Sequence, residues 1–205
     1  MAEHIVSRTV LLEIRQDRAM IVEGHHFLDE KRVMLAREML KRLEAYREDI
    51  QSWQEARVRA ERCLKAAIVR HGLEGLQVHP VPARGFSRAQ HAEHPFLGIT
   101  LLVEVHGLDP AAMEDMALGT ASNPSPEAVE CGTTFAALMS LALQLAAAHA
   151  NLMRLRDEYR RTDRRVRALE NVILPEIEEE ERRVSDLLDE SEQEEVIRSH
   201  LFAGK

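Results

Sequence analysis

The sequence predicts a mainly α-helical protein, a long antiparallel two-helix coiled-coil hairpin with a small β-hairpin-containing head in the middle of the chain. In a run near each end, apolar residues recur at steps of three and four, which is the pattern of helices that pack along one face. Aromatic residues make up 4% and charged residues 30% of the 205 residues, which suits long helices better than a thick sheet core. Six of the seven prolines lie between the two runs, so turns and strands are expected there.

The first predicted helix begins near Ser7 or Thr9, either of which can cap it, and runs to about Arg70. His71-Gly72 then offers a stop. About sixty residues at 1.5 Å each make a helix roughly 90 Å long. Its apolar line, called the seam here, passes through Ile14, Ile21, Leu28, Leu35, Met39, Leu43, Tyr46, Ile50, Trp53, Arg57, Ala60, Leu64 and Ala67.

The middle segment, residues 72–127, is predicted to be the β-containing head between helical residues 1–71 and 128–205. Residues 76–78 and 99–105 have the composition of strands, the second more clearly because it reads Ile-Thr-Leu-Leu-Val-Glu-Val. The stretch from Pro82 to Pro95 is predicted to be a loop.

The second predicted helix begins between Ser125 and Thr134 and runs to about Ser199. Pro175 lies inside it and is expected to bend or loosen it, because proline removes one backbone hydrogen bond. Folding the chain about its middle places Tyr46 opposite Leu155. The predicted seam is Leu138, Leu141, Leu145, Ala148, Leu152, Leu155, Tyr159, Thr162, Val166, Leu169 and Ile173, then, after a step of four, Ile177, Glu180, Val184 and Leu187.

The bulk properties exclude several classes of function. A net charge of −8 and a pI of about 5.7 disfavour nucleic-acid binding. The only cysteines, Cys63 and Cys131, support no disulfide framework, and the first residues lack a signal-peptide pattern, so a cytoplasmic chain is expected. Residues 133–153 carry no charge and are long enough to span a bilayer, but they continue into a charged helix. A helix buried against other protein is therefore preferred to a membrane span.

No catalytic, cofactor-binding or metal site is predicted. His91 and His94 are three residues apart without a matching carboxylate or thiolate set, and His25 and His26 are adjacent and point to different helix faces. The basic run 154–167 is interrupted by acids, so it is either a solvated face with local ion pairs or a collar that meets acidic partner surfaces.

Two segments then resemble the D subunit of V-type and archaeal-type rotary ATPases. Residues 24–35, Gly-His-His-Phe-Leu-Asp-Glu-Lys-Arg-Val-Met-Leu, are similar to the family pattern Gly-His-x-Leu-Leu-Lys-x-Lys-Arg-Asp-x-Leu. Residues 164–175, Arg-Arg-Val-Arg-Ala-Leu-Glu-Asn-Val-Ile-Leu-Pro, are similar to Arg-Arg-Val-Asn-Ala-Leu-Glu-x-Val-x-Ile-Pro. Residues 188–192 look like its Leu-Asp-Glu-x-Glu ending. Asp29, Val33 and Arg167 depart from the pattern, and so does the stretch 198–200.

The resemblance implies a non-catalytic central-stalk rotor. It implies a rod inside a ring of A and B subunits, with a small F subunit and a funnel-shaped subunit that links to the membrane ion ring. It also implies a place at the inner face of the cell membrane without a membrane span. The rotor-surface residues that it implies are Gly24, Lys31, Arg32, Arg161, Arg164, Arg165, Glu170 and Pro175.

Two alternatives stay open. Heptad patterns also occur in unrelated coiled-coil scaffolds that self-associate or tether other proteins. An enzyme or metal-binding helical bundle is a third possibility, although it would need inward-facing Glu and His sets on several helices, and the seams show none.

Overall fold

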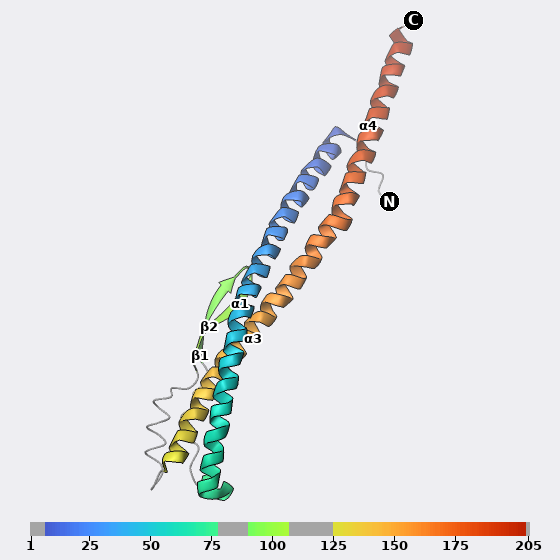
Figure 1. Ribbon diagram of the computed structural model, residues 1–205. Helices are drawn as coiled ribbons and strands as arrows, with labels where there is room; N and C mark the ends of the chain where they lie inside the picture. The colour runs from blue at the N-terminus through green and yellow to red at the C-terminus, as the bar shows by residue number, and fades with distance from the viewer. Residues whose placement is uncertain (1–6, 78–89, 107–124, 204–205) are drawn as a thin grey trace. The chain divides into compact units, whose positions relative to one another are not determined.

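The computed structural model describes residues 7–77, 90–106 and 125–203 (Figure 1). The predicted fold class is confirmed: two long helical runs flank a small antiparallel β-hairpin. The chain forms two compact units, each containing part of both runs: unit 1 is Met1–Met34 with Tyr159–Lys205, and unit 2 is Leu35–Glu158. The elements are α1 (Arg8–Gln77), β1 (Gln90–Phe96), β2 (Ile99–His106), α3 (Pro126–Ala168), η1 (Leu169–Ile173) and α4 (Leu174–Ala203).

Helix α1 is capped by Ser7, one of the two predicted caps. The Ser7 hydroxyl accepts a hydrogen bond from the Val10 N–H at 3.3 Å. At the other end Gly72 has φ 69° and breaks the helix at the predicted stop, since only glycine adopts this conformation without strain. Helical structure resumes and runs to Gln77, so the predicted strand is wrong for Leu76 and Gln77, while Val78 lies outside the described residues.

Unit 2 has a core lined largely by small residues. Ala56, Ala60 and Ala67 of α1 and Ala136 of α3 are buried, and their short side chains let two helices approach closely. Arg57, predicted on the seam, is exposed, and Ala56 takes its place.

The pairing of the two helices in unit 2 differs from the predicted register. The ring of Tyr46 lies 6.1 Å from that of His149, centroid to centroid. This partner is six residues before the predicted Leu155. The same two helices also meet at Cys63 with Glu130 and at Arg70 with Glu127. The contacts run forward along α1 and backward along α3, so the two helices are antiparallel.

The β-hairpin of unit 2 turns at Leu97-Gly98. Both residues have positive φ (47° and 87°), as a two-residue hairpin turn of type I′ requires. The prediction for residues 99–105 is confirmed by β2, but the predicted loop up to Pro95 is wrong for residues 90–95, which form β1. Residues 82–89 lie outside the described residues. β1 reads Gln-His-Ala-Glu-His-Pro-Phe, without strand pattern, so pairing with β2 rather than propensity makes it a strand.

In unit 1, the first part of α1 packs against the end of α3, η1 and α4. Few side chains are buried between them: Ile14 from α1, with Thr162 and Val166 from α3. From Asp189 to Phe202 every residue is exposed.

The loosening expected at Pro175 is confirmed, because a π-helical turn directly precedes it. In η1 the Leu174 N–H donates to the Leu169 carbonyl five residues back rather than four. This wider turn accommodates a proline that cannot donate and whose ring would crowd the carbonyl four residues earlier. It also shifts the seam by one residue. The predicted seam residues Ile173, Glu180 and Leu187 are exposed, and Glu181 and Leu188 are half-buried instead.

Candidate interaction surface

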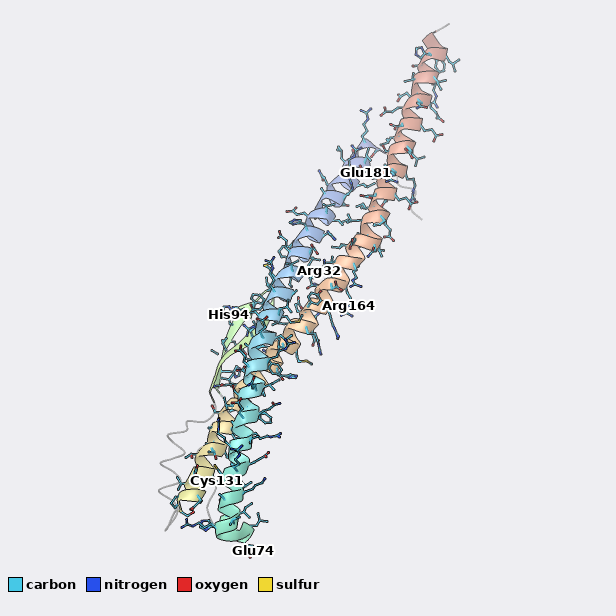
Figure 2. The ribbon with its side chains drawn as sticks, viewed as in Figure 1. Arg32, Glu74, His94, Cys131, Arg164 and Glu181 are labelled. Atoms are coloured by element: carbon cyan, nitrogen blue, oxygen red, sulfur yellow. The ribbon has the colours of Figure 1, made fainter. Side chains whose placement is uncertain are left out.

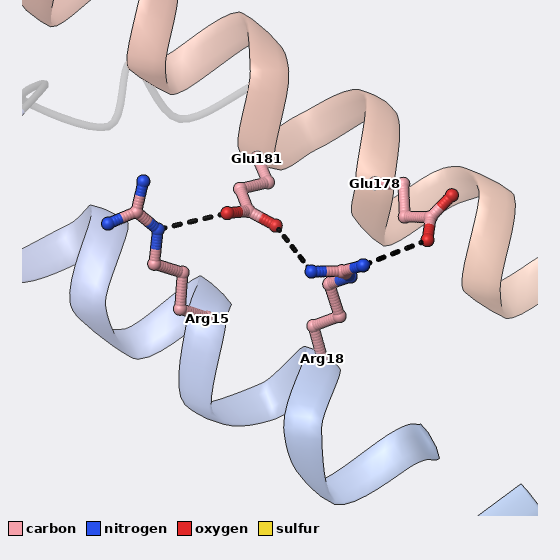
Figure 3. A network of polar contacts seen from close by, with 4 residues as sticks. All are labelled: Arg15, Arg18, Glu178 and Glu181. Carbon is pink, nitrogen blue, oxygen red and sulfur yellow. Dashed lines mark hydrogen bonds and ion pairs between the residues drawn. The ribbon is translucent and has the colours of Figure 1, made fainter.

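Ion pairs join α1 to α4 in unit 1 (Figure 3). Arg15 Nε lies 2.9 Å from Glu181 Oε1, and Arg18 lies 3.3 Å from Glu178 and 3.6 Å from the second oxygen of Glu181. Glu181 thus forms ion pairs with two arginines one helical turn apart. These contacts favour one longitudinal position of the two helices, because sliding one helix along the other would separate the charges.

Arg32, a predicted rotor-surface residue (labelled in Figure 2), is taken up by a second cluster inside unit 1. Its guanidinium lies 3.2 Å from Asp163 and 2.5 Å from Asp29. Arg167 approaches the other oxygen of Asp163 at 3.0 Å, and the Asp163 side chain is only 18% exposed. Arg32 therefore contributes to holding the chain's own helices together.

Most of the other predicted rotor-surface residues lie on the outside of unit 1. Arg164 (labelled in Figure 2) and Arg165 are exposed on α3, and Glu170 in η1 and Pro175 in α4 are exposed as well. Arg161 is also exposed but takes part in a further interaction, as does the half-buried Lys31. Asn171 donates from Nδ2 to the Arg167 carbonyl at 3.0 Å, which supports the backbone just before the π turn.

Gly24 lies next to open space on α1. Apart from its two chain neighbours and the nearby backbone of α1, a Cβ added there would meet no atom within 4 Å in the described part of the chain, so no close contact within this chain explains a glycine that weakens the helix at this position. On either side of it, Met20 and Phe27 are 65% and 63% exposed, and Met34 is exposed further along.

These residues form a second seam that sequence reasoning missed. Met20, Gly24, Phe27, Lys31 and Met34 follow one another at alternating steps of four and three. Each lies one position before a residue on the buried side of α1, so the second seam is about 100° away around the helix. The residues on the buried side are Ile21, His25, Leu28, Arg32 and Leu35. Its signal in the sequence is the seven-residue spacing of Met20, Phe27 and Met34. We name Met20, Gly24, Phe27, Lys31 and Met34 the outer seam.

The last turns of α4 carry further exposed apolar side chains. Val196, Ile197, Leu201 and Phe202 are all more than half exposed. A soluble chain rarely leaves so many large apolar groups in water, and such surfaces usually mark contacts with other proteins.

At the far end of unit 2, side chains tie the end of α1 to the start of α3. Ser125 caps α3 by accepting from the Ala128 N–H at 3.2 Å, and its hydroxyl lies 2.5 Å from His71 Nε2. Glu127 accepts a hydrogen bond from its own backbone N–H and another from Arg70, and both lower the pKa of its carboxyl. The Ser–His contact is thus part of a helix cap.

The described residues hold no group of three or more His, Cys, Asp and Glu side chains placed to bind a metal. His91 lies 3.5 Å from Glu93 on exposed β1, and His26 lies 3.7 Å from Glu30. Cys63 and Cys131 are both free thiols, and burial, with the nearby Cys63, raises the pKa of Cys131.

The described part of the chain contains one helical run, Pro126–Phe202, that is long and apolar enough to cross a membrane by length and composition alone. Only 11% of its most apolar window is buried inside the protein. Most of the other residues between 133 and 153 are half-buried, so the fold of this chain covers one side of the helix and leaves the other side exposed.

Together these features define a helical protein whose apolar surface exceeds what its own fold covers, as in subunits that are completed by neighbours. The family model of the ATP synthase D subunit matches residues 10–203, and the chain belongs to this family.

Relatives carry the same description. The D subunit of the V-type ATP synthase of Anaeromyxobacter dehalogenans is 29% identical over 206 residues, covering 100% of this chain and 98% of the relative. The D subunit of the V-type ATP synthase of Thermotoga neapolitana is 23% identical over 192 residues, covering 94% and 93%. The D subunit of the A-type ATP synthase of Methanopyrus kandleri is 27% identical over 197 residues, covering 94% and 82%.

Proposed function

We propose that this chain is the non-catalytic central rotor subunit of a V/A-type rotary ATPase. It couples ATP hydrolysis or synthesis in a catalytic ring to proton or sodium translocation across the membrane. The observation that carries the proposal is the outer seam. It overlaps the family-like segment 24–35, and no described part of the chain covers its glycine. A helix face of this kind suits contact with a surrounding subunit.

The charges of unit 1 support a drive-shaft role. Torque applied to one helical run must pass to the other, and arginine–carboxylate pairs from α1 to α3 and α4 oppose sliding of one run along the other. Meanwhile α3 presents Arg164 and Arg165 outward, whereas α1 presents the outer seam. A shaft with chemically different sides can make different contacts with three successive sites of a ring.

The partners proposed are the A and B subunits of the ring, the small F subunit of the stalk, and the funnel-shaped subunit that leads to the membrane ion ring. The exposed side of the uncharged window of α3 is then covered by another subunit rather than by lipid. The chain is placed at the cytoplasmic face of the membrane as a peripheral part of a membrane complex.

Stoichiometry tests this proposal against a self-associating scaffold. The full-length chain, affinity-tagged at its native expression level, is purified and its partners are quantified by mass spectrometry. A rotor subunit yields one copy per complex together with ring subunits and a small stalk partner. A homodimer recovered without ATPase subunits would overturn the proposal.

The exposed arginines provide a sharper test of coupling. We expect Arg161, Arg164 and Arg165 changed together to Gln to lower ion pumping per ATP hydrolysed several-fold, because the collar loses three charges toward its ring partners. ATP hydrolysis and pumping are measured together in reconstituted vesicles. The charge-matched control changes three exposed arginines of unit 2, Arg47, Arg59 and Arg62, to Gln. Equal coupling in both triple variants would contradict a role for this collar.

A further inference from the structure

Asn151 of α3 bonds to both backbone groups of one residue of the β-hairpin. Its Oδ1 accepts from the Leu102 N–H at 2.8 Å, and its Nδ2 donates to the Leu102 carbonyl at 2.7 Å. Asn151 is only 2% exposed, so water competes little for these groups. A residue of a neighbouring strand would make the same pair of bonds. The amide side chain thus substitutes for a strand at the outer edge of β2.

Arg154, three residues further along α3, continues the arrangement. It donates to the Thr100 carbonyl at 2.6 Å, two residues before Leu102. Alternate residues of β2 direct their backbone groups toward α3, while the intervening Leu101 is 1% exposed. The two polar side chains match the two-residue repeat of the strand, and a slip by one residue would turn these groups away.

The opposite edge of the hairpin carries features that oppose further pairing. Leu102 pairs with Glu93 and Thr100 with Pro95 across the two strands. The Leu102 and Thr100 groups bonded to α3 face away from β1, so Glu93 and Pro95 direct their backbone outward as well. Pro95 offers no N–H there, and the register is interrupted between Gln90 and Ala92. The hairpin therefore uses one edge for α3 and has a blocked edge on the other side.

We propose that Asn151, assisted by Arg154, is a positioning residue that latches the β-hairpin to α3 in a single register, so that the hairpin moves with the helix rather than as a hinged flap. The nearby cleft of about 380 Å³, lined by α1, β2 and α3 residues including Tyr46, Gln144 and Asn151, shows that side-chain packing there is incomplete. The polar latch then supplies the register that a loosely filled contact leaves undefined. The inference concerns the chain alone and does not depend on the rotor role.

Amide hydrogen exchange of the full-length chain tests the latch. Asn151→Leu keeps the number and branching of the side-chain heavy atoms and removes both bonds, and we expect the protection of the Leu102 amide to fall about ten- to a hundredfold. Gln144→Leu serves as the control, because Gln144 lines the same cleft and is not one of the two side chains bonded to the hairpin backbone. This variant should leave the Leu102 amide protected. Unchanged protection of Leu102 in Asn151→Leu would overturn the proposal.

A second variant separates a latch from a general packing role. In Asn151→Asp the carboxylate can accept from the Leu102 N–H but has no proton for the Leu102 carbonyl. Protonation restores one donor, so the latch in this variant strengthens as the pH falls through the pKa of the new carboxyl, which burial raises and the neighbouring Arg154 lowers. We expect Leu102 protection, measured relative to Leu155, to recover several-fold between pH 7 and pH 5 in this variant and not in the wild type. A variant that stays equally unprotected at both pH values would contradict the latch.

Discussion

The two compact units hold their helices together by different means. In unit 2 the buried groups include alanines and large apolar side chains such as Leu101 and Leu155, with Asn151 as a polar exception. In unit 1 the buried set is small, and arginine–carboxylate pairs span the two helices. Unit 2 therefore relies mainly on dispersion and burial, which depend on volume, whereas unit 1 relies more on pairings that depend on position.

The difference also separates the surfaces. Unit 1 directs little apolar area inward and leaves Met20, Phe27 and the end of α4 exposed, so its apolar surface is available to neighbouring subunits. Unit 2 instead carries a folded accessory element, the hairpin, fixed by polar contacts to α3. The helices of unit 1 pack weakly against each other, whereas unit 2 bonds the hairpin firmly to α3. This difference indicates different roles for the two units.

The largest expected effect is in the core of unit 2. Leu155 is fully buried, so Leu155→Ala should lower the free energy of unfolding by about 2–5 kcal/mol through lost burial and the cavity left behind. Urea unfolding followed by circular dichroism measures it. Leu152→Ala, at the neighbouring half-buried position, is the control and should cost clearly less. Equal losses of unfolding free energy in the two variants would mean that Leu155 is no more buried than Leu152.

A smaller effect, of opposite sign, is expected at Gly24 in unit 1. Gly24→Ala should stabilise the isolated chain by about 0.5–1 kcal/mol, because alanine is the better helix former and the space is open. In the assembled ATPase the added methyl group should instead reduce recovery of the complex, if a partner approaches this glycine. Thermal unfolding measures the stability of the isolated chain, and the yield of purified complex measures assembly. A more stable chain with a full yield of complex would mean that Gly24 is not at an interface.

The smallest effect concerns the ion pairs. A double-mutant cycle with Arg32→Met and Asp163→Asn should give a coupling of about 0.5–1 kcal/mol that shrinks in 1 M salt, since the pair is partly shielded from water. The same cycle on Arg8 and Glu192, which are largely exposed, should give no measurable coupling. Stronger coupling in the exposed pair would reverse the explanation offered for unit 1.

Sequence patterns predicted the helices, the second strand and the disturbance at Pro175, because each depends on local chemistry. They missed β1, whose residues have no strand pattern and which exists by pairing with β2. They also placed Leu152 and Tyr159 on the seam, whereas Asn151 and Glu158 are the buried residues. Polar residues at such positions depend on partners distant in sequence, and a periodic apolar pattern cannot reveal them.

The candidate site was predictable only in part. The family-like segments marked the right region, and Arg164 and Arg165 are exposed as a contact surface requires. Arg32 looked like one of the same group, but Asp163, 131 residues away in sequence, draws it into the helix pair. The outer seam does have a signal in the sequence, the seven-residue spacing of Met20, Phe27 and Met34.

The π turn at residues 169–173 has a consequence for how insertions and deletions act on this protein. The turn holds one residue more than an ordinary helical turn, so the residues after it lie one position later on the seam. Deleting a single residue between Leu169 and Ile173 would let an ordinary turn form and leave Glu178 and Glu181 facing their arginines. Deleting a single residue between Pro175 and Ile177 would instead rotate both carboxylates by about 100° away from α1. The π turn can therefore absorb the loss of one residue, whereas the ordinary helix that follows it cannot.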